Sequence, residues 1–135
     1  MKTPLRTRLL GACAELLFSA KCHELGYYVS KPWSDDCPYD FILDSGQRLI
    51  RVQVKSTSSP ASKSGGYYCT IRRRSGVLRS YRKKDVDVIA VYISPEEAWV
   101  IIPVRELSQH TTFYFKPRDP NSQYSSFVEA WHLLK

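Results

Sequence analysis

The hydrophobic and polar positions along this chain predict a series of β-strands that lies between two helices. Apolar residues alternate with polar ones, or form short runs bounded by turn residues, as is typical of strands. Segments of this kind lie at residues 27–30, 39–44, 48–56, 67–74, 86–94 and 98–104. Ser45-Gly46 predicts a tight hairpin between the second and third segments, and Pro95-Glu96-Glu97 predicts another between the last two.

Both ends of the chain carry helical patterns. Thr3-Pro4 is suited to the start of a helix, and Gly26 is suited to its end. From Leu9 to Ala20 this helix is apolar on nearly all sides, which predicts that it is largely buried. Residues 125–134 place apolar side chains at helical spacing and predict a C-terminal helix.

The composition fits a folded protein with one α+β domain. The chain has 135 residues, of which 43% are hydrophobic and 13% aromatic, and this excludes a disordered chain. No apolar run approaches the ~18 residues of a membrane span, so we expect no membrane partner and a cytoplasmic protein. The spacing of Cys13, Cys22 and His23 matches no common zinc template, and we expect reduced thiols. The predicted fold is a mixed central β-sheet within one domain over residues 1–135, flanked by an N-terminal and a C-terminal helix.

Positive charge is concentrated in the middle of the chain. Residues 45–84 contain eleven of the 20 Lys and Arg residues and none of the 13 Asp and Glu residues. A basic segment without acids is typical of a surface that binds nucleic acid. We predict nucleic-acid contacts from Arg51, Lys63, Arg72, Arg73, Arg74, Arg79, Arg82, Lys83 and Lys84. Tyr67, Tyr68 and Tyr81 interleave with this segment and fit either base stacking or packing within the protein.

The predicted strand at residues 48–56 has one apolar face and one polar face. The apolar face carries Ile50, Val52 and Val54, and the polar face carries Arg51, Gln53 and Lys55. If Asp44 pairs with Gln47 across the hairpin, Asp40 lies opposite Arg51, with Gln53 as its diagonal neighbour. A slip of one residue would expose the apolar face, so the core pattern opposes it. A carboxylate, an amide and an amine are therefore expected to lie close together beside the core.

Glu15 is the only charged residue between Arg8 and Lys21 in the first predicted helix. A lone carboxylate on a buried helix is costly unless it is paired or bound to a metal ion. We therefore expect Glu15 to form either a structural ion pair, for example with Lys55, or part of a functional site.

The order of these residues resembles the PD-(D/E)XK nuclease superfamily. Pro38-Tyr39-Asp40 stands at the place of the P-D element, Gln53-Val54-Lys55 at the place of (D/E)-x-K, and Glu15 at the place of the glutamate in the first helix. The sequence over residues 9–57 is similar to the small single-domain branch that includes group I intron homing endonucleases and archaeal junction-resolvase-like nucleases. The resemblance implies a restriction-endonuclease-like fold. Gln53 departs from the usual acid, although the intron-endonuclease branch is similar in having glutamine there.

The resemblance also implies a catalytic site made of Glu15, Asp40, Gln53 and Lys55. Asp40, Gln53 and Glu15 would bind Mg²⁺, or alternatively Mn²⁺, because both ions favour oxygen ligands. Lys55 would orient the attacking water and stabilise developing negative charge. We therefore expect a Mg²⁺-dependent endonuclease that cuts double-stranded DNA at specific sites, in the manner of a homing enzyme. Cutting both strands requires two sites, so we expect a homodimer or homotetramer.

Three alternatives stay open on the sequence alone. The first is a nuclease that acts like a Holliday-junction resolvase. The second is a catalytically inactive nucleic-acid-binding module on the same fold, which Gln53 would permit. The third is a nucleic-acid-binding α+β protein unrelated to nucleases, in which Glu15 and Asp40 would lie far apart.

Overall fold

The computed structural model of the chain describes residues 4–58, 61–72, 81–107 and 111–135. Its elements are α1 (Pro4–Glu24), β1 (Tyr28–Ser30), β2 (Phe41–Asp44), β3 (Leu49–Thr57), β4 (Tyr67–Thr70), β5 (Val88–Ile93), β6 (Ala98–Pro103) and β7 (Thr112–Phe115), with 3₁₀ turns η1 (Ser94–Glu96), η2 (Val104–Glu106), η3 (Ser125–Phe127) and η4 (Trp131–Leu134). Five strands form one sheet in the order β1-β2-β3-β5-β6. Neighbouring strands of this sheet are antiparallel, except for β3 and β5, which are parallel. The expected mixed sheet of an α+β protein is therefore confirmed.

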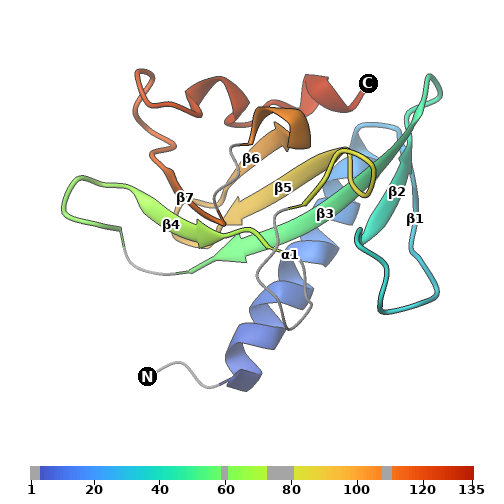
Figure 1. Cartoon of the computed structure of the whole chain (residues 1–135), viewed down its shortest axis with the longest axis horizontal. Helices are drawn as coiled ribbons and strands as arrows, with labels where there is room; N and C mark the ends of the chain where they lie inside the picture. The colour runs from blue at the N-terminus through green and yellow to red at the C-terminus, as the bar shows by residue number, and fades with distance from the viewer. Residues whose placement is uncertain (1–3, 59–60, 73–80, 108–110) are drawn as a thin grey trace.

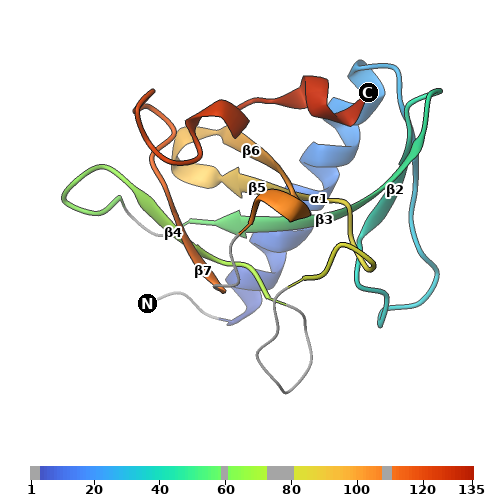
Figure 2. The ribbon, with the colours of Figure 1, turned by 45° about the horizontal axis from the view of Figure 1, so that its top comes forward.

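The two faces of this sheet are covered by different elements. In Figure 1, α1 passes behind the sheet, and Figure 2 shows the antiparallel β4–β7 ribbon on the opposite side. Side chains packed on the α1 side include Phe18, Val52, Val54, Val88, Trp99 and Ile101. Side chains packed under the ribbon include Tyr67, Cys69, Ile89, Val91, Phe113 and Phe115. The alternating strands thus give the sheet an apolar core on each face.

The first helix forms where the sequence predicts it, but its expected burial is wrong. The helix ends in a Schellman motif, in which Tyr27 N–H donates to the carbonyl of Cys22 and Gly26 adopts a φ of 84°. Leu9 and Leu16 are 61% and 72% exposed, although Phe18 is completely buried. The sheet lies on one side of α1 only, so one stripe of the helix packs and the opposite apolar stripe faces outward. Within the part of the chain that the structure describes, no helix is long and apolar enough to cross a membrane.

The C-terminal helix expected at residues 125–134 is also wrong. Two short 3₁₀ turns, η3 and η4, lie there instead, and Glu129 between them has a φ of 52°. This segment pairs with the outer side of β6: Glu129 N–H donates to the carbonyl of Trp99 at 2.8 Å, and Trp99 N–H donates to Glu129 Oε1 at 3.0 Å. Hydrogen bonds with β6 therefore replace the bonds that a continuous helix would make internally.

Candidate active site

The β2–β3 hairpin positions the predicted acidic residue Asp40. The partner of Arg51 is Ile42, so the expected pairing of Asp40 with Arg51 is wrong. The turn is longer than predicted, because Ser45 N–H donates to the carbonyl of Arg48 at 3.2 Å and Asp44 pairs with Leu49. The pairing thus differs from the expected one by two residues, which preserves the two faces of β3.

Asp40 is bound to β3 on both sides of Gln53. The Asp40 N–H donates to the carbonyl of Val52 at 2.9 Å, and the Val54 N–H donates to Asp40 Oδ2 at 2.8 Å. The Asp40 carboxylate thus takes the place of a backbone carbonyl just before the start of β2. The orientation of this side chain is fixed by main-chain hydrogen bonds, and it lies directly beside Gln53.

The electrostatic surroundings of Asp40 include the predicted partners from other elements. The pKa of Asp40 lies above its ordinary value, mainly because the carboxyl group is buried. The hydrogen bond from Val54 lowers the pKa, but by less than burial raises it. The Glu15 carboxylate raises the pKa further, whereas the ammonium groups of Lys55 and Lys31 lower it. Glu15 from α1, Asp40 before β2 and Lys55 from β3 are therefore close enough to influence one carboxyl group. The alternative in which Glu15 and Asp40 lie far apart does not fit this arrangement.

Lys31 is a member of this cluster that the sequence reasoning missed. Its Nζ lies 3.1 Å from Glu15 Oε1 and 5.4 Å from the centre of the Phe41 ring. The ion pair considered for Glu15 is thus made with Lys31. A signal was present, because Lys31 is the only Lys or Arg between Lys21 and Arg48.

The two candidate residues on β3 point toward the β4–β7 side of the sheet. Lys55 Nζ donates to the carbonyl of Arg72 at 3.3 Å and lies 5.4 Å from the centre of the Tyr81 ring. The Gln53 side-chain amide donates to the carbonyl of Val54 at 3.4 Å. The lysine thus lies next to the basic segment that begins at Arg72.

The oxygen atoms at this site suit a small divalent cation. No group of three or more His, Cys, Asp or Glu side chains converges among residues 4–58, 61–72, 81–107 and 111–135. Glu15 and Asp40 could supply two carboxylates, and Gln53 could supply an amide oxygen. Mg²⁺ is usually held by one or two carboxylates together with water and phosphate, so this donor set fits it. Burial makes the charged form of Asp40 less favourable, and a bound cation would offset this effect.

The basic residues predicted to contact nucleic acid differ in their surroundings. Arg51 Nη2 lies 3.0 Å from Asp87 Oδ1 and also donates to the carbonyl of Lys83 at 3.1 Å. Asp87 therefore partly neutralises the charge of Arg51 within the protein. Exposed side chains in this set are Lys63, Arg72, Arg82, Lys83 and Lys84. Arg73, Arg74 and Arg79 lie outside the described residues.

Comparisons with known proteins agree on the fold and the family. A family model described as PD-(D/E)XK endonuclease matches residues 5–134. The solved structure of the bacterial homing endonuclease I-Ssp6803I has a TM-score of 0.81 and 30% identity, over 95% of this chain and 92% of that chain. The Holliday junction resolvase Hjc of Archaeoglobus fulgidus shares the fold, with a TM-score of 0.57 and 17% identity over 91% and 93% of the two chains. No curated protein sequence matches.

These matches cover nearly the whole chain, including the sheet and the segments that contain Glu15, Asp40 and Lys55. Nucleases of this family generally use divalent metal ions, which agrees with the oxygen donors described above. The restriction-endonuclease-like fold and the full-length match together show that this chain belongs to the PD-(D/E)XK endonuclease family.

Proposed function

We propose that this protein is a Mg²⁺-dependent endonuclease that hydrolyses phosphodiester bonds in double-stranded DNA at specific sites, as a homing-type enzyme does. The observation that carries the proposal is the position of the Asp40 carboxylate beside Gln53 on β3, fixed by the 2.8 Å hydrogen bond from the Val54 N–H. The 30% identity to a bacterial homing endonuclease over almost the full length supports the homing type.

Each residue of the site has a distinct task in this proposal. Asp40, Glu15 and the amide oxygen of Gln53 would hold Mg²⁺ or Mn²⁺. The cation would supply positive charge to the phosphate and favour ionisation of water. Asp40 is oriented for this task by the Val54 N–H. Lys55 would orient the attacking water and stabilise the negative charge that develops on the phosphate oxygens.

Plasmid cleavage tests the proposal. Supercoiled plasmid and a library of random duplexes are incubated with the protein and Mg²⁺, Mn²⁺ or EDTA, and the new DNA ends are sequenced. We expect metal-dependent cuts that Asp40→Asn and Lys55→Ala reduce by at least 100-fold. Asp35→Asn is a matched control, because Asp35 is an exposed acid in the loop before Asp40, and it should cut like the wild type. Cutting by Asp40→Asn at the wild-type rate would refute the site.

The proposed enzyme acts as a homodimer or homotetramer, because each copy has one such site and a double-strand break needs two. The outward stripe of α1 supports self-association. Leu9 and Leu16 are exposed on this stripe, and Leu17 is 41% exposed. The neighbouring Ala12 and Cys13 are exposed as well. A second copy fits this stripe, because two apolar helix faces can bury each other across a two-fold axis.

Light scattering during size-exclusion chromatography tests the oligomer. We expect Leu16→Gln to shift the protein toward the monomer at micromolar concentration. Leu49→Gln is the control, since Leu49 is 68% exposed on the face of β3 opposite to the one that packs against α1. A wild-type protein that is monomeric and still makes double-strand cuts would contradict the oligomer.

A catalytically inactive DNA-binding module is the second candidate. Two observations favour it: Gln53 carries no charge, and Lys31 occupies Glu15 Oε1. Such a module would bind duplexes equally with Mg²⁺ and with EDTA and would cut none of them. A resolvase-like enzyme would instead cut a four-way junction faster than a linear duplex of the same sequence.

A further inference from the structure

The β4–β7 ribbon has a free outer face beside the candidate active site. Its inner side chains, such as Cys69 and Phe113, are buried against the main sheet. Its outer face carries two cross-strand pairs, Tyr68 with Tyr114 and Thr70 with Thr112. Tyr68 is 60% exposed, and Thr70 and Thr112 are exposed as well. The outer face therefore presents hydroxyl groups and an aromatic surface to whatever lies against it.

The ribbon is fixed to β3 at two points along or just beyond β4, and one of them involves the candidate catalytic lysine. Thr57 Oγ1 donates to the carbonyl of Tyr68 at 2.9 Å, and Lys55 Nζ donates to the carbonyl of Arg72 just beyond β4. Because both bonds involve β3, the outer face of the ribbon has a defined position relative to Lys55. Arg72, which follows β4, therefore lies next to Lys55.

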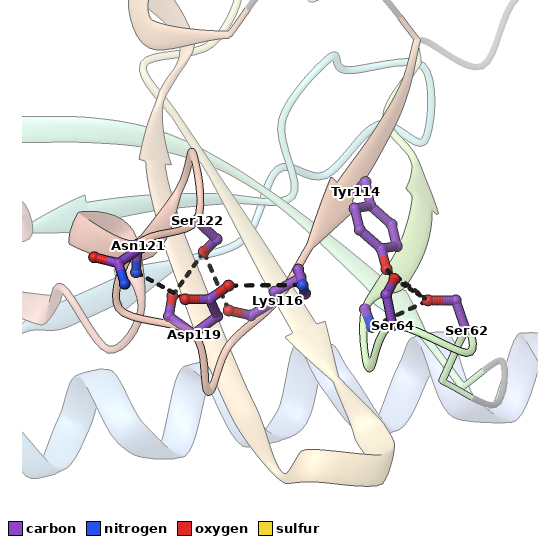
Figure 3. Close-up of polar contacts among 8 residues, drawn as sticks. Ser62, Ser64, Tyr114, Lys116, Asp119, Asn121 and Ser122 are labelled. Atoms are coloured by element: carbon purple, nitrogen blue, oxygen red, sulfur yellow. Dashed lines mark hydrogen bonds and ion pairs between the residues drawn. The ribbon is translucent and has the colours of Figure 1, made fainter.

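The loop that precedes β4 is fastened to Tyr114, whereas Tyr68, Thr70 and Thr112 stay exposed. In Figure 3 the Tyr114 hydroxyl points to the hydroxyls of Ser62 and Ser64, with which it forms hydrogen bonds. The loop after β7 is closed by its own contacts, including the 3.6 Å ion pair of Lys116 with Asp119. A cavity of about 500 Å³ opens beside β7 and is lined by Thr112, Tyr114 and Lys116 among others.

The charge and dimensions of the ribbon fit duplex DNA. The outer face has no acidic side chain on β4 or β7, and the exposed Lys63 and Arg72 flank β4. Strands of four residues are ~13 Å long, and the major groove is ~12 Å wide and admits a two-stranded ribbon. The two cross-strand pairs are separated by ~7 Å, which is about the rise of two base pairs.

We infer that the outer face of the β4–β7 ribbon lies in the major groove next to the cleavage site and determines the sequence that is recognised. This inference rests on the proposed nuclease function. The Thr70 and Thr112 hydroxyls and methyl groups contact base edges, to which threonine can donate, accept or pack. Tyr68 packs against Tyr114 with the rings tilted and their centres 4.7 Å apart, and this pair supports the base-reading face. Lys63 contacts phosphate and contributes affinity without sequence preference.

Selection from a duplex library without metal tests this inference independently of cleavage. The protein is incubated in EDTA with duplexes containing a random central segment, and bound DNA is sequenced after several rounds. We expect Thr70→Val/Thr112→Val to lose preference at one or two neighbouring positions by about 5- to 100-fold. The valines keep the side-chain shape, and each single variant is measured as well in case the double variant unfolds. Ser30→Ala, an exposed change on β1, is the control and should select the wild-type sequence.

Lys63→Gln gives a second, separable result. We expect it to weaken binding to all duplexes in the library alike and to reduce the slope of log affinity against log salt by about 1. Lys135→Gln removes the same charge at an exposed position far from the ribbon and should leave the slope unchanged.

The outcomes separate this inference from the proposed function. Altered preference in the threonine variants, with the wild-type preference kept by Ser30→Ala, supports the ribbon as the reading surface. An unchanged selected sequence overturns it, as does a wild-type protein that binds duplexes without any preference. In both of those cases metal-dependent plasmid cleavage would still stand as support for the nuclease. A wild-type protein that neither binds nor cuts duplex DNA would overturn both proposals.

Discussion

Replacing Asp87 by alanine tests how the basic turn is joined to the strand that carries Gln53 and Lys55. The Asp87 carboxylate accepts hydrogen bonds from Arg51 at the backbone N (2.8 Å), Nε (3.1 Å) and Nη2 (3.0 Å). The side chains of Arg51 and Asp87 are 32% and 35% exposed, so solvent weakens this ion pair. At about 0.5–1.5 kcal/mol for each hydrogen bond, three bonds amount to about 1.5–4.5 kcal/mol.

Thermal unfolding measures this loss. For a chain of this length, Asp87→Ala should lower the Tm by about 6–15 °C at pH 7. Glu106→Ala is the control, because its ion pair with Arg105, at 3.5 Å, joins two exposed side chains. The control should change the Tm by less than about 2 °C. A Tm for Asp87→Ala within that same range would refute the reasoning.

The pH dependence of the Asp87 effect has a defined sign. Burial acts to raise the pKa of Asp87, but the hydrogen bonds and charge of Arg51 outweigh it and lower the pKa below 3.8. A lowered pKa in the folded protein means that the carboxylate stabilises the fold fully above the ordinary value. This stabilisation is lost as the pH falls through the lowered pKa. The Tm difference between wild type and Asp87→Ala should therefore shrink below about pH 4, and a difference that acid leaves unchanged would contradict this explanation.

Three further predictions concern the acidic cluster. Without metal at pH 8, Asp40→Asn should raise the Tm slightly. Burial and Glu15 raise the pKa of Asp40, so its charged form is unfavourable in the folded protein. A lower Tm at pH 8 would contradict this. Calorimetry should show that Lys31→Gln tightens Mn²⁺ binding about 1.5- to 5-fold, because this change frees Glu15 from a partly exposed ion pair. Lys21→Gln is the control. Weaker Mn²⁺ binding by Lys31→Gln would count against the assigned ligands. Gln53→Glu should also tighten Mn²⁺ binding by adding a charged oxygen ligand, and an unchanged affinity would place Gln53 outside the metal site.

Local sequence signals were sufficient to predict the elements that carry the site. Pro4 and Gly26 delimit α1, and the alternation from Ile50 to Lys55 assigned the two faces of β3 correctly. The turn was harder, since its length depends on how Asp44 and Ser45 bind the backbone of the loop. The pairing was therefore two residues off, although the faces were right, because the period of a strand is two. The roles assigned to Glu15, Asp40, Gln53 and Lys55 stay predictions.

Features that depend on contacts between distant segments could not be predicted. Glu129 pairs with Trp99, and no local pattern indicates that this pairing replaces a helical turn. The short strand β7 is held by β4, which lies more than 40 residues earlier in the chain. Similarly, the exposure of Leu16 depends on which side of α1 the sheet covers, and an apolar sequence alone does not determine that.

The pairing of Glu129 and Val128 with β6 also affects how the protein is made. Without that segment, β6 would be the uncovered edge of the five-stranded sheet, with free N–H and carbonyl groups that another chain can join. Synthesis runs from the N-terminus, so β6 leaves the ribosome before the residues that cover it. There is consequently an interval in which a nascent copy can exchange strands with a neighbour and aggregate. A protein that lacks residues 125–135 would leave the edge of β6 exposed permanently.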